Sequence, residues 1–186
     1  MRTIIVVSAL AFSTLLFINN RCDAQAYKIK TFSGSVGAEA LFTEPTLSGT
    51  NKTGAGVTLK GEYVFGEHAS TTISSGYYFM PGKPVLNTKN AAISAIPVKA
   101  GVRYYFGTFY GAGEAGGIFF TGDNSRAGFL YSLGMGDKFS LGKNVFDIGL
   151  RHEGWSTAEG SRGVIALRVA YEFALNVKQD SRMPDF

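Results

Sequence analysis

The sequence predicts an all-β fold, an eight-stranded antiparallel up-and-down transmembrane β-barrel that follows an N-terminal signal peptide. Three observations predict it. Apolar and polar residues alternate along most of the chain; glycine is abundant (24) and proline scarce (5); and there are 15 phenylalanines and 9 tyrosines, gathered at the ends of the alternating segments. Because successive strand side chains face opposite sides of a sheet, each segment has one oily face and one polar face. Such strands, with aromatic residues at their ends, are typical of a barrel whose outer face meets lipid.

Residues 1–24 are expected to be a signal peptide that is separate from the fold. Arg2 supplies a positive start, and Ile4 to Ile18 is an apolar run of signal-peptide length. A cut after Ala24 removes Cys22, the only cysteine, so the mature protein would hold no disulfide. A membrane anchor fits less well because the run is short for a bilayer span. Lipid attachment at Cys22 also fits less well, because the polar residues 19–21 precede it.

The net charge of the chain is +4 and becomes +3 once Arg2, Arg21 and Asp23 are removed with the signal peptide. This charge is mild, and the chain has no basic run and no platform of stacked aromatic residues. The sequence therefore predicts no nucleic-acid partner.

The first three strands are expected in the half of the chain nearest the signal peptide. Phe32–Thr43 alternates apolar residues with serines and Glu39, and a loop rich in turn-forming residues follows it. Ala55–Phe65 sets valine, leucine and aromatic residues against threonine, lysine and glutamate. A tight turn at residues 66–68 leads to Thr71–Met80, whose isoleucine and aromatic residues share one face, and the longest loop follows.

The next two strands form a hairpin with a short turn. Ile96–Phe106 alternates without a break, with six apolar residues on one face and Lys99 and Arg103 on the other. Phe109–Phe119 is rich in glycine and carries Glu114 on its inward face. These glycines lie inside a strand, so they indicate close packing and not a phosphate-binding loop.

The last three strands complete an even count. Gly128–Phe139 alternates as expected, except that Asp137 takes the outward position near its end, which suggests a bulge or an exit into water. Val145–Gly154 sets apolar residues against charged ones. A loop at residues 156–161 then leads to Gly163–Phe173, which alternates to its end.

The strand lengths and the spacing of the loops fit a membrane barrel. A tilted transmembrane strand needs about 9–11 residues, and an even number of strands brings both termini to one side. Longer loops and short turns alternate, so we expect the loops outside the cell and the turns in the periplasm. The loops lie around Asn51, Asn87, Asn124 and Glu159, and the turns lie at Gly66, Gly107 and Gly142.

The main alternative all-β fold is a soluble barrel of the lipocalin kind, oily inside and polar outside. Two girdles of aromatic residues argue against it, because they serve no purpose around a dry ligand cavity. The charges on the polar face also balance, as a packed lumen requires and a solvated face does not. The acids are Glu39, Glu62, Glu114, Asp147, Glu153 and Glu172, and the bases are Lys60, Lys99, Arg103, Lys138, Arg151 and Arg168. We expect these residues to form an interior salt-bridge network, in which Arg103 and Arg168 pair with Glu114, Glu62 or Glu172.

The segments IPVKAGVRYYF, FYGAGEAGGIFF, NVFDIGLRHEGW and GVIALRVAYEF resemble the small outer-membrane β-barrel family, the OmpA/OmpX-like eight-stranded barrels, in the form common in Bacteroidetes. The resemblance covers residues 32–173 and makes residues 25–175 the barrel domain. It implies a location in the cell outer membrane and a structural, adhesive or membrane-integrity role without catalysis. It also implies outer-membrane lipid as a partner, periplasmic chaperones and the barrel-assembly machinery during biogenesis, and a monomer.

The resemblance further assigns Tyr171 and Phe173 as the assembly signal, the alternating aromatic residues that end the last strand. The chain departs from the family by continuing for 13 residues past Phe173. Residues 176–186 are expected to form a short polar periplasmic tail.

Two other functions remain open. Outer-membrane lipid A deacylases use a histidine on the barrel wall with a nearby serine and an acid, and the candidates are His152, Ser156, Glu153 and Glu159. Such a lipid-modifying enzyme needs the histidine and the serine side by side, whereas Ser156 falls four residues on, in a loop. A narrow channel is the other alternative, although side chains fill the lumen of an eight-stranded barrel. His68 and Glu67 lack a third ligand close in sequence, so we expect no metal site and no cofactor.

Overall fold

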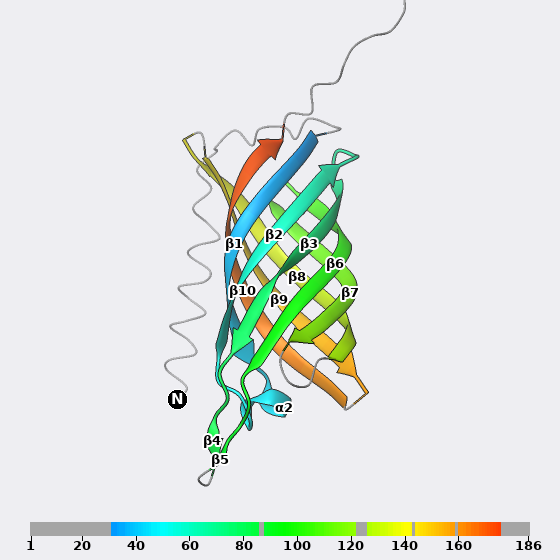
Figure 1. The fold of residues 1–186 in the computed structure, drawn as a ribbon. Coiled ribbons are helices and arrows are strands. Elements are labelled where there is room, and N and C mark those ends of the chain that lie inside the picture. Colours follow the sequence, from blue (N-terminus) through cyan, green and yellow to red (C-terminus); the bar gives the residue numbers. More distant parts are fainter. Residues whose placement is uncertain (1–30, 86–87, 122–125, 143, 159, 176–186) are drawn as a thin grey trace, which may run out of the picture.

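The computed structural model describes residues 31–85, 88–121, 126–142, 144–158 and 160–175. Eight strands form one closed antiparallel barrel, which confirms the predicted fold (Figure 1). The strands are β1 (Thr31–Thr43), β2 (Gly54–Val64), β3 (Ala69–Met80), β6 (Ile93–Phe106), β7 (Phe109–Thr121), β8 (Arg126–Leu141), β9 (Asn144–Thr157) and β10 (Gly160–Leu175). The expected signal peptide and tail lie outside the described residues, as do Asn87, Asn124 and Glu159.

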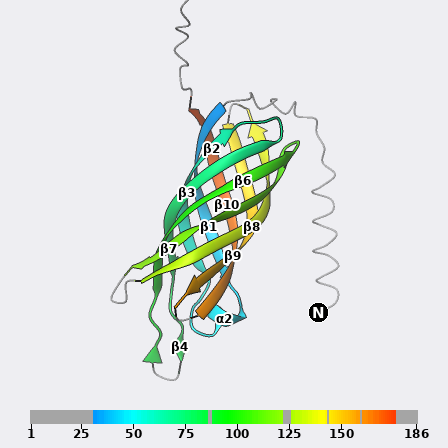
Figure 2. The same cartoon turned by 90° about the vertical axis from the view of Figure 1, so that its right-hand side faces the viewer.

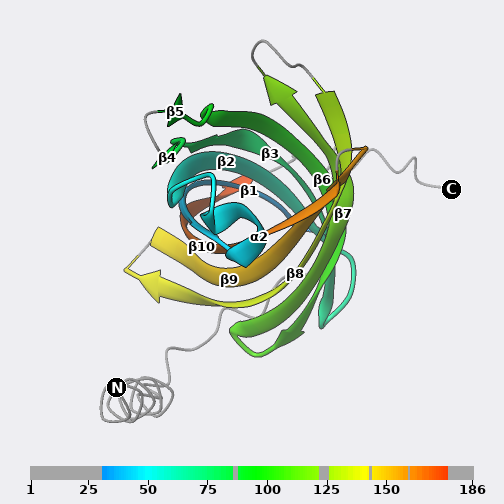
Figure 3. The same cartoon turned by 90° about the horizontal axis from the view of Figure 1, so that it is seen from below.

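Each strand pairs with its neighbours in sequence, and β1 pairs with β10 to close the sheet, as the view along the barrel shows (Figure 3). The closing ladder runs from Phe32 opposite Leu175 to Thr43 opposite Val164 without a break. Closure leaves no open edge, and that matters because unpaired backbone groups cost several kcal/mol each in hydrocarbon.

The connections differ between the two ends of the barrel (Figures 1 and 2). One end, called the loop end here, carries α2 (Pro45–Ser48) and a two-stranded ladder of β4 (Pro84–Val85) and β5 (Thr88–Lys89), which extends past the rim. The other, the turn end, holds the short connections β2–β3, β6–β7 and β8–β9. Gly107 (φ 74°) and Gly142 (φ 64°) supply left-handed conformations in two of these turns. That the loop end faces out of the cell stays a prediction.

Within the described ranges, no helix combines the length and the apolar character needed to cross a bilayer.

The outer surface of the barrel is apolar and its interior is charged, the reverse of a soluble protein. The lipid-facing side chains of Leu59, Ile73 and Leu133 are more than 60% exposed. By contrast, Lys99 and Arg168 are each 3% exposed, inside the lumen. Isolated exposed apolar residues are common, but a continuous apolar belt marks a surface that contacts membrane. The inside-out distribution excludes the lipocalin-like alternative.

Aromatic side chains pack against one another at the turn end, where a girdle was predicted. The ring of Phe146 lies 5.6 Å from that of Phe139 and 5.9 Å from that of Tyr171, measured between centroids. Phe173 covers Gly34 across the closing ladder, since a Cβ at Gly34 would lie 2.6 Å from the Phe173 ring. The Phe173 ring therefore packs across the ladder between β1 and β10 at the turn end.

The structure corrects the expected loop at residues 156–161. Ser156 pairs with Phe129 on one side and Ser161 on the other, so β9 and β10 continue through most of this segment. Gly160 opposite Thr157 adopts φ 128°, a backbone conformation that suits glycine and permits a much tighter connection.

Asp137 does not mark a bulge. The ladders on both sides of it are continuous, and its exposed side chain leaves the barrel wall near the turn end. The second expected explanation, an exit into water, agrees with this position.

The ladder between β3 and β6 contains a gap at Pro97. Pairs form at Ser75–Val98 and at Tyr78–Ala95, but the two pairs between them are missing. Proline has no backbone N–H to donate, which accounts for the interruption. The register is the same on both sides of the gap, so the inward and outward faces keep their assignment.

Candidate functional site

The lumen is the first candidate site, because it gathers all the charged residues that the sequence assigned to the inward face. Glu62 is a centre of this network. Its Oε2 lies 3.0 Å from Arg103 Nη1 and 2.9 Å from Lys138 Nζ. Ser70 donates a hydrogen bond of 2.5 Å to Oε1, and the Tyr105 hydroxyl donates to the same oxygen. The carboxylate therefore has two cations and two hydroxyl donors in place of water.

Asp147 forms a second centre from strand β9. Its Oδ2 lies 2.9 Å from Arg103 and 3.0 Å from Arg168, while the Tyr110 hydroxyl donates to Oδ1 at 2.5 Å. The guanidinium of Arg103 also lies over the Tyr110 ring, 4.1 Å from its centroid. Arg103 thus joins the two centres, since it bonds both Glu62 and Asp147.

A third group of charges lies closer to the loop end. Lys99 Nζ lies 2.8 Å from Glu153, and Arg151 Nε lies 3.2 Å from the same carboxylate oxygen. The guanidinium of Arg151 also reaches both oxygens of Glu39, at 3.0 and 2.5 Å. A bidentate pair of this kind, between a guanidinium and a carboxylate, is among the strongest contacts that side chains form.

Arg168 contacts Asp147 and Glu39 in place of the three glutamates that were expected as its partners. Glu114 bonds Lys60 at 2.7 Å and Lys99 at 3.4 Å rather than an arginine, and Glu172 bonds Lys138 at 2.7 Å. The six acids and six bases all lie in the lumen and form pairs with one another. Charges held in a water-poor interior need such partners, because an unpaired one is costly.

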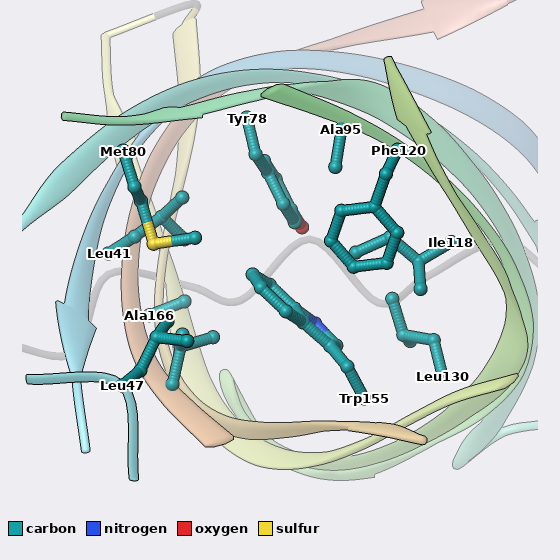
Figure 4. Close-up of a cluster of buried hydrophobic side chains, with 11 residues drawn as sticks. Leu41, Leu47, Tyr78, Met80, Ala95, Ile118, Phe120, Leu130, Trp155 and Ala166 are labelled. Atoms are coloured by element: carbon teal, nitrogen blue, oxygen red, sulfur yellow. The ribbon is translucent and has the colours of Figure 1, made fainter. Parts of the chain in front are cut away.

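An apolar plug fills the lumen between this network and the loop end (Figure 4). The plug consists of Leu41, Leu47, Tyr78, Met80, Ala95, Ile118, Phe120, Leu130, Trp155, Val164 and Ala166. Leu47 comes from α2, so this short helix covers the mouth of the barrel with a buried side chain. The centroid of the Trp155 ring lies 6.4 Å from that of the Tyr78 ring and 5.9 Å from that of the Phe120 ring. The sequence placed some of these residues inward but did not predict that they meet.

Tyr78 and Trp155 connect the plug to the charged network. Arg151 donates a 2.7 Å hydrogen bond to the Tyr78 hydroxyl, and the indole N–H of Trp155 donates to Glu153 at 2.8 Å. Their polar atoms are satisfied while their rings complete the apolar layer. The apolar plug and the charged network are therefore in direct contact.

A cavity of about 30 Å³ lies within the charged layer, beside Lys60, Arg103, Glu114, Arg151 and Arg168. This volume accommodates about one or two water molecules. The cavity lies on the turn-end side of the plug.

The outward face near the loop end is the second candidate site, and its geometry does not support the alternative of a deacylase. His152 lies on the lipid-facing side, and Ser156 follows four residues on along the same face of β9. Glu153 points into the lumen and is fully buried, so it lies on the other face from His152. Glu159 is outside the described residues.

The structure instead brings His152 to an acid that the sequence did not single out. His152 Nε2 lies 3.0 Å from Oε1 of Glu44, the residue between β1 and α2. Pairing of β1 with β10 and of β10 with β9 makes these distant residues neighbours. In the ranges that the structure describes, no group of three or more His, Cys, Asp or Glu side chains could hold a metal ion.

Comparison with known proteins finds no matching family model and no matching curated sequence. Several solved structures do match. The Yersinia pestis outer-membrane protein Ail in a phospholipid nanodisc is 18% identical with a TM-score of 0.53, and the match covers 77% of this chain and 99% of Ail. Neisserial surface protein A is 11% identical with a TM-score of 0.50, and the match covers 76% of this chain and 94% of that one. At such low identities the structural match shows the shared fold alone, which is that of the small outer-membrane β-barrels.

Proposed function

We propose that this protein is a structural barrel of the bacterial outer membrane, which supports membrane integrity without transport or catalysis. The observation that carries the proposal is the filled lumen, in which a neutral salt-bridge network and an apolar plug follow one another. The apolar outer belt supports a location in lipid. The expected partners are the surrounding lipid and, during biogenesis, periplasmic chaperones and the assembly machinery. The Bacteroidetes form of the family and the monomeric state remain predictions.

Adhesion is a second candidate role, favoured by the way the loop end is braced. Lys83 Nζ donates to the Ser48 carbonyl at 2.5 Å, and Asn51 donates to the Ala91 carbonyl at 3.2 Å. Asn90 donates to the Lys83 carbonyl at 3.1 Å. These bonds connect described residues of α2 and its C-terminal turn with described residues on either side of β4 and β5. Replacing residues 82–91 with a short Gly-Ser turn should abolish adherence and leave membrane integrity unchanged, which separates the two roles.

In planar bilayers, the purified full-length protein should show no stable conductance steps under conditions in which a larger porin conducts. The reason is that an ion would have to cross both the apolar plug around Trp155 and the paired charges on the turn-end side of the plug. Reproducible unitary steps from the wild-type protein would establish the narrow channel in place of a closed barrel.

Cells that lack the protein provide the matching test of its role. They should admit a large hydrophobic dye faster than the parent strain, and a copy of the gene should restore the barrier. The His152→Ala variant should restore it equally well, because the proposed role requires no catalysis. If this variant fails while release of fatty acid from membrane lipid stops with it, the lipid-modifying enzyme is the correct function.

A further inference from the structure

The cavity within the charged layer has a positively charged wall, although the charges of the whole network balance. Among the described residues that line it, the cations are Lys60, Arg103, Arg151 and Arg168, and the one acid is Glu114. The carboxylates that bond the three arginines do not line the cavity; they belong to Glu39, Glu62, Asp147 and Glu153. The acids therefore lie behind the cations as seen from the cavity, and the nearest charges to its contents are positive.

The cations of this wall share their acids, so no single carboxylate neutralises each of them. Arg103 and Arg168 both contact Oδ2 of Asp147, at 2.9 and 3.0 Å, which brings the two guanidinium groups close together. Glu114 is likewise divided between Lys60 at 2.7 Å and Lys99 at 3.4 Å. Like charges repel strongly at such separations when little water surrounds them. An anion in the cavity would offset this repulsion.

Hydrogen-bond donors are also in excess around the cavity. Arg103 is 2% exposed, and its two Nη atoms contact Glu62 and Asp147. Its Nε is buried and has no hydrogen-bond partner among the described residues. The Tyr110 hydroxyl is already committed as a donor to Asp147. A buried N–H without an acceptor is costly, and an anion that only accepts hydrogen bonds would satisfy it.

Small residues on the wall leave room for a guest of limited size. The lining on β7, β8 and β9 includes Ala112, Ser132, Gly134 and Gly149. The cavity of about 30 Å³ has the volume of about one or two water molecules. A monovalent anion fits better than a divalent one, because the rest of the lumen is neutral and each added negative charge has to be balanced by the wall alone. We propose that this cavity binds one chloride ion, held by Lys60, Arg103 and Arg168.

Bromide, which replaces chloride and scatters X-rays anomalously, locates the ion directly. Crystals of the full-length protein grown in bromide should show one anomalous peak inside the cavity, near Lys60, Arg103 and Arg168. In detergent, chloride should replace gluconate at constant ionic strength with a saturable gain in stability. The unfolding equilibrium constant should decrease about tenfold when the chloride concentration is about ten times its Kd.

Ala112→Leu should fill the cavity and abolish the chloride effect. Ala115→Leu is the matched control, because it makes the same change on the lipid-facing side of the same strand, and it should keep the effect. If Ala112→Leu does not fold, Lys60→Gln takes its place, and it should weaken the effect because it removes one of the three cations.

The absence of anomalous density from the cavity would overturn the site. Peaks confined to the outer surface would show an adventitious ion only and would also overturn it, as would an equal chloride effect in the wild-type protein and Ala112→Leu. None of these measurements depends on the role of the barrel in the membrane. The anion site and the proposed function can therefore fail separately.

Discussion

Replacing Arg103 with methionine should lower the free energy of unfolding in detergent by about 3–5 kcal/mol. Arg103 is 2% exposed and bonds Glu62 at 3.0 Å and Asp147 at 2.9 Å. Methionine fills much of the same space but leaves the salt-bridge network with six acids and five bases. The cost comes from carboxylates that lose a cation where water cannot replace it, and from the lost contact with the Tyr110 ring.

Urea unfolding followed by the fluorescence of Trp155, the single tryptophan, measures this change. Lys52→Met is the matched control, since it removes an exposed positive charge at the loop end. The double variant Arg103→Met, Asp147→Asn should recover part of the loss, because it restores the balance of charges. A decrease for Arg103→Met no larger than that for Lys52→Met would contradict the packed-lumen account.

Replacing Tyr171 and Phe173 together with alanine should prevent the accumulation of folded barrel in the outer membrane. Phe173 covers Gly34 at the join of β1 and β10, and Tyr171 packs on Phe146 and donates to Asn144 at 3.3 Å. Without these contacts the closing strand is held at the turn end mainly by its backbone. Failure to close exposes two strand edges at once, each a row of unpaired backbone groups in hydrocarbon.

Cell fractionation with a gel assay for folded protein measures this effect. Phe129→Ala, which removes a lipid-facing aromatic residue at the loop end, should still assemble, and so should a chain that ends at Leu175. The assignment of the assembly signal to the last strand is wrong if the shortened chain stays in the periplasm while the double alanine variant assembles.

Alternation alone predicted the strands and their faces. The side-chain period of a strand is two residues, so a single well-marked segment such as Ile96–Phe106 fixes which residues share a face. The charged residues could then be placed in the lumen without knowledge of strand register. Their individual partners could not, because the pairs formed by Glu114 and Glu172 depend on where strands from distant parts of the sequence meet.

The same limit explains the features that the sequence did not predict. The inward apolar residues Leu41, Tyr78 and Trp155 come from different strands, and only their register places them at one level to form the plug. The contact between His152 and Glu44 depends on two ladders and on the path of the chain into α2. A loop was expected at residues 156–161, but β9 and β10 continue to pair as far as Thr157 and Gly160, where Gly160 adopts φ 128°.

Membrane fractionation combined with heat-modifiable gel mobility tests the central claim most directly, that this chain is a lipid-embedded barrel with its apolar face outward. The full-length protein is produced in a Gram-negative host, the outer membrane is isolated by density, and each fraction is run with and without boiling. The account predicts that the protein is found in the outer-membrane fraction, resists extraction with alkaline carbonate, and changes its mobility when boiled. Recovery in the soluble fraction, with the same mobility before and after boiling, would contradict it.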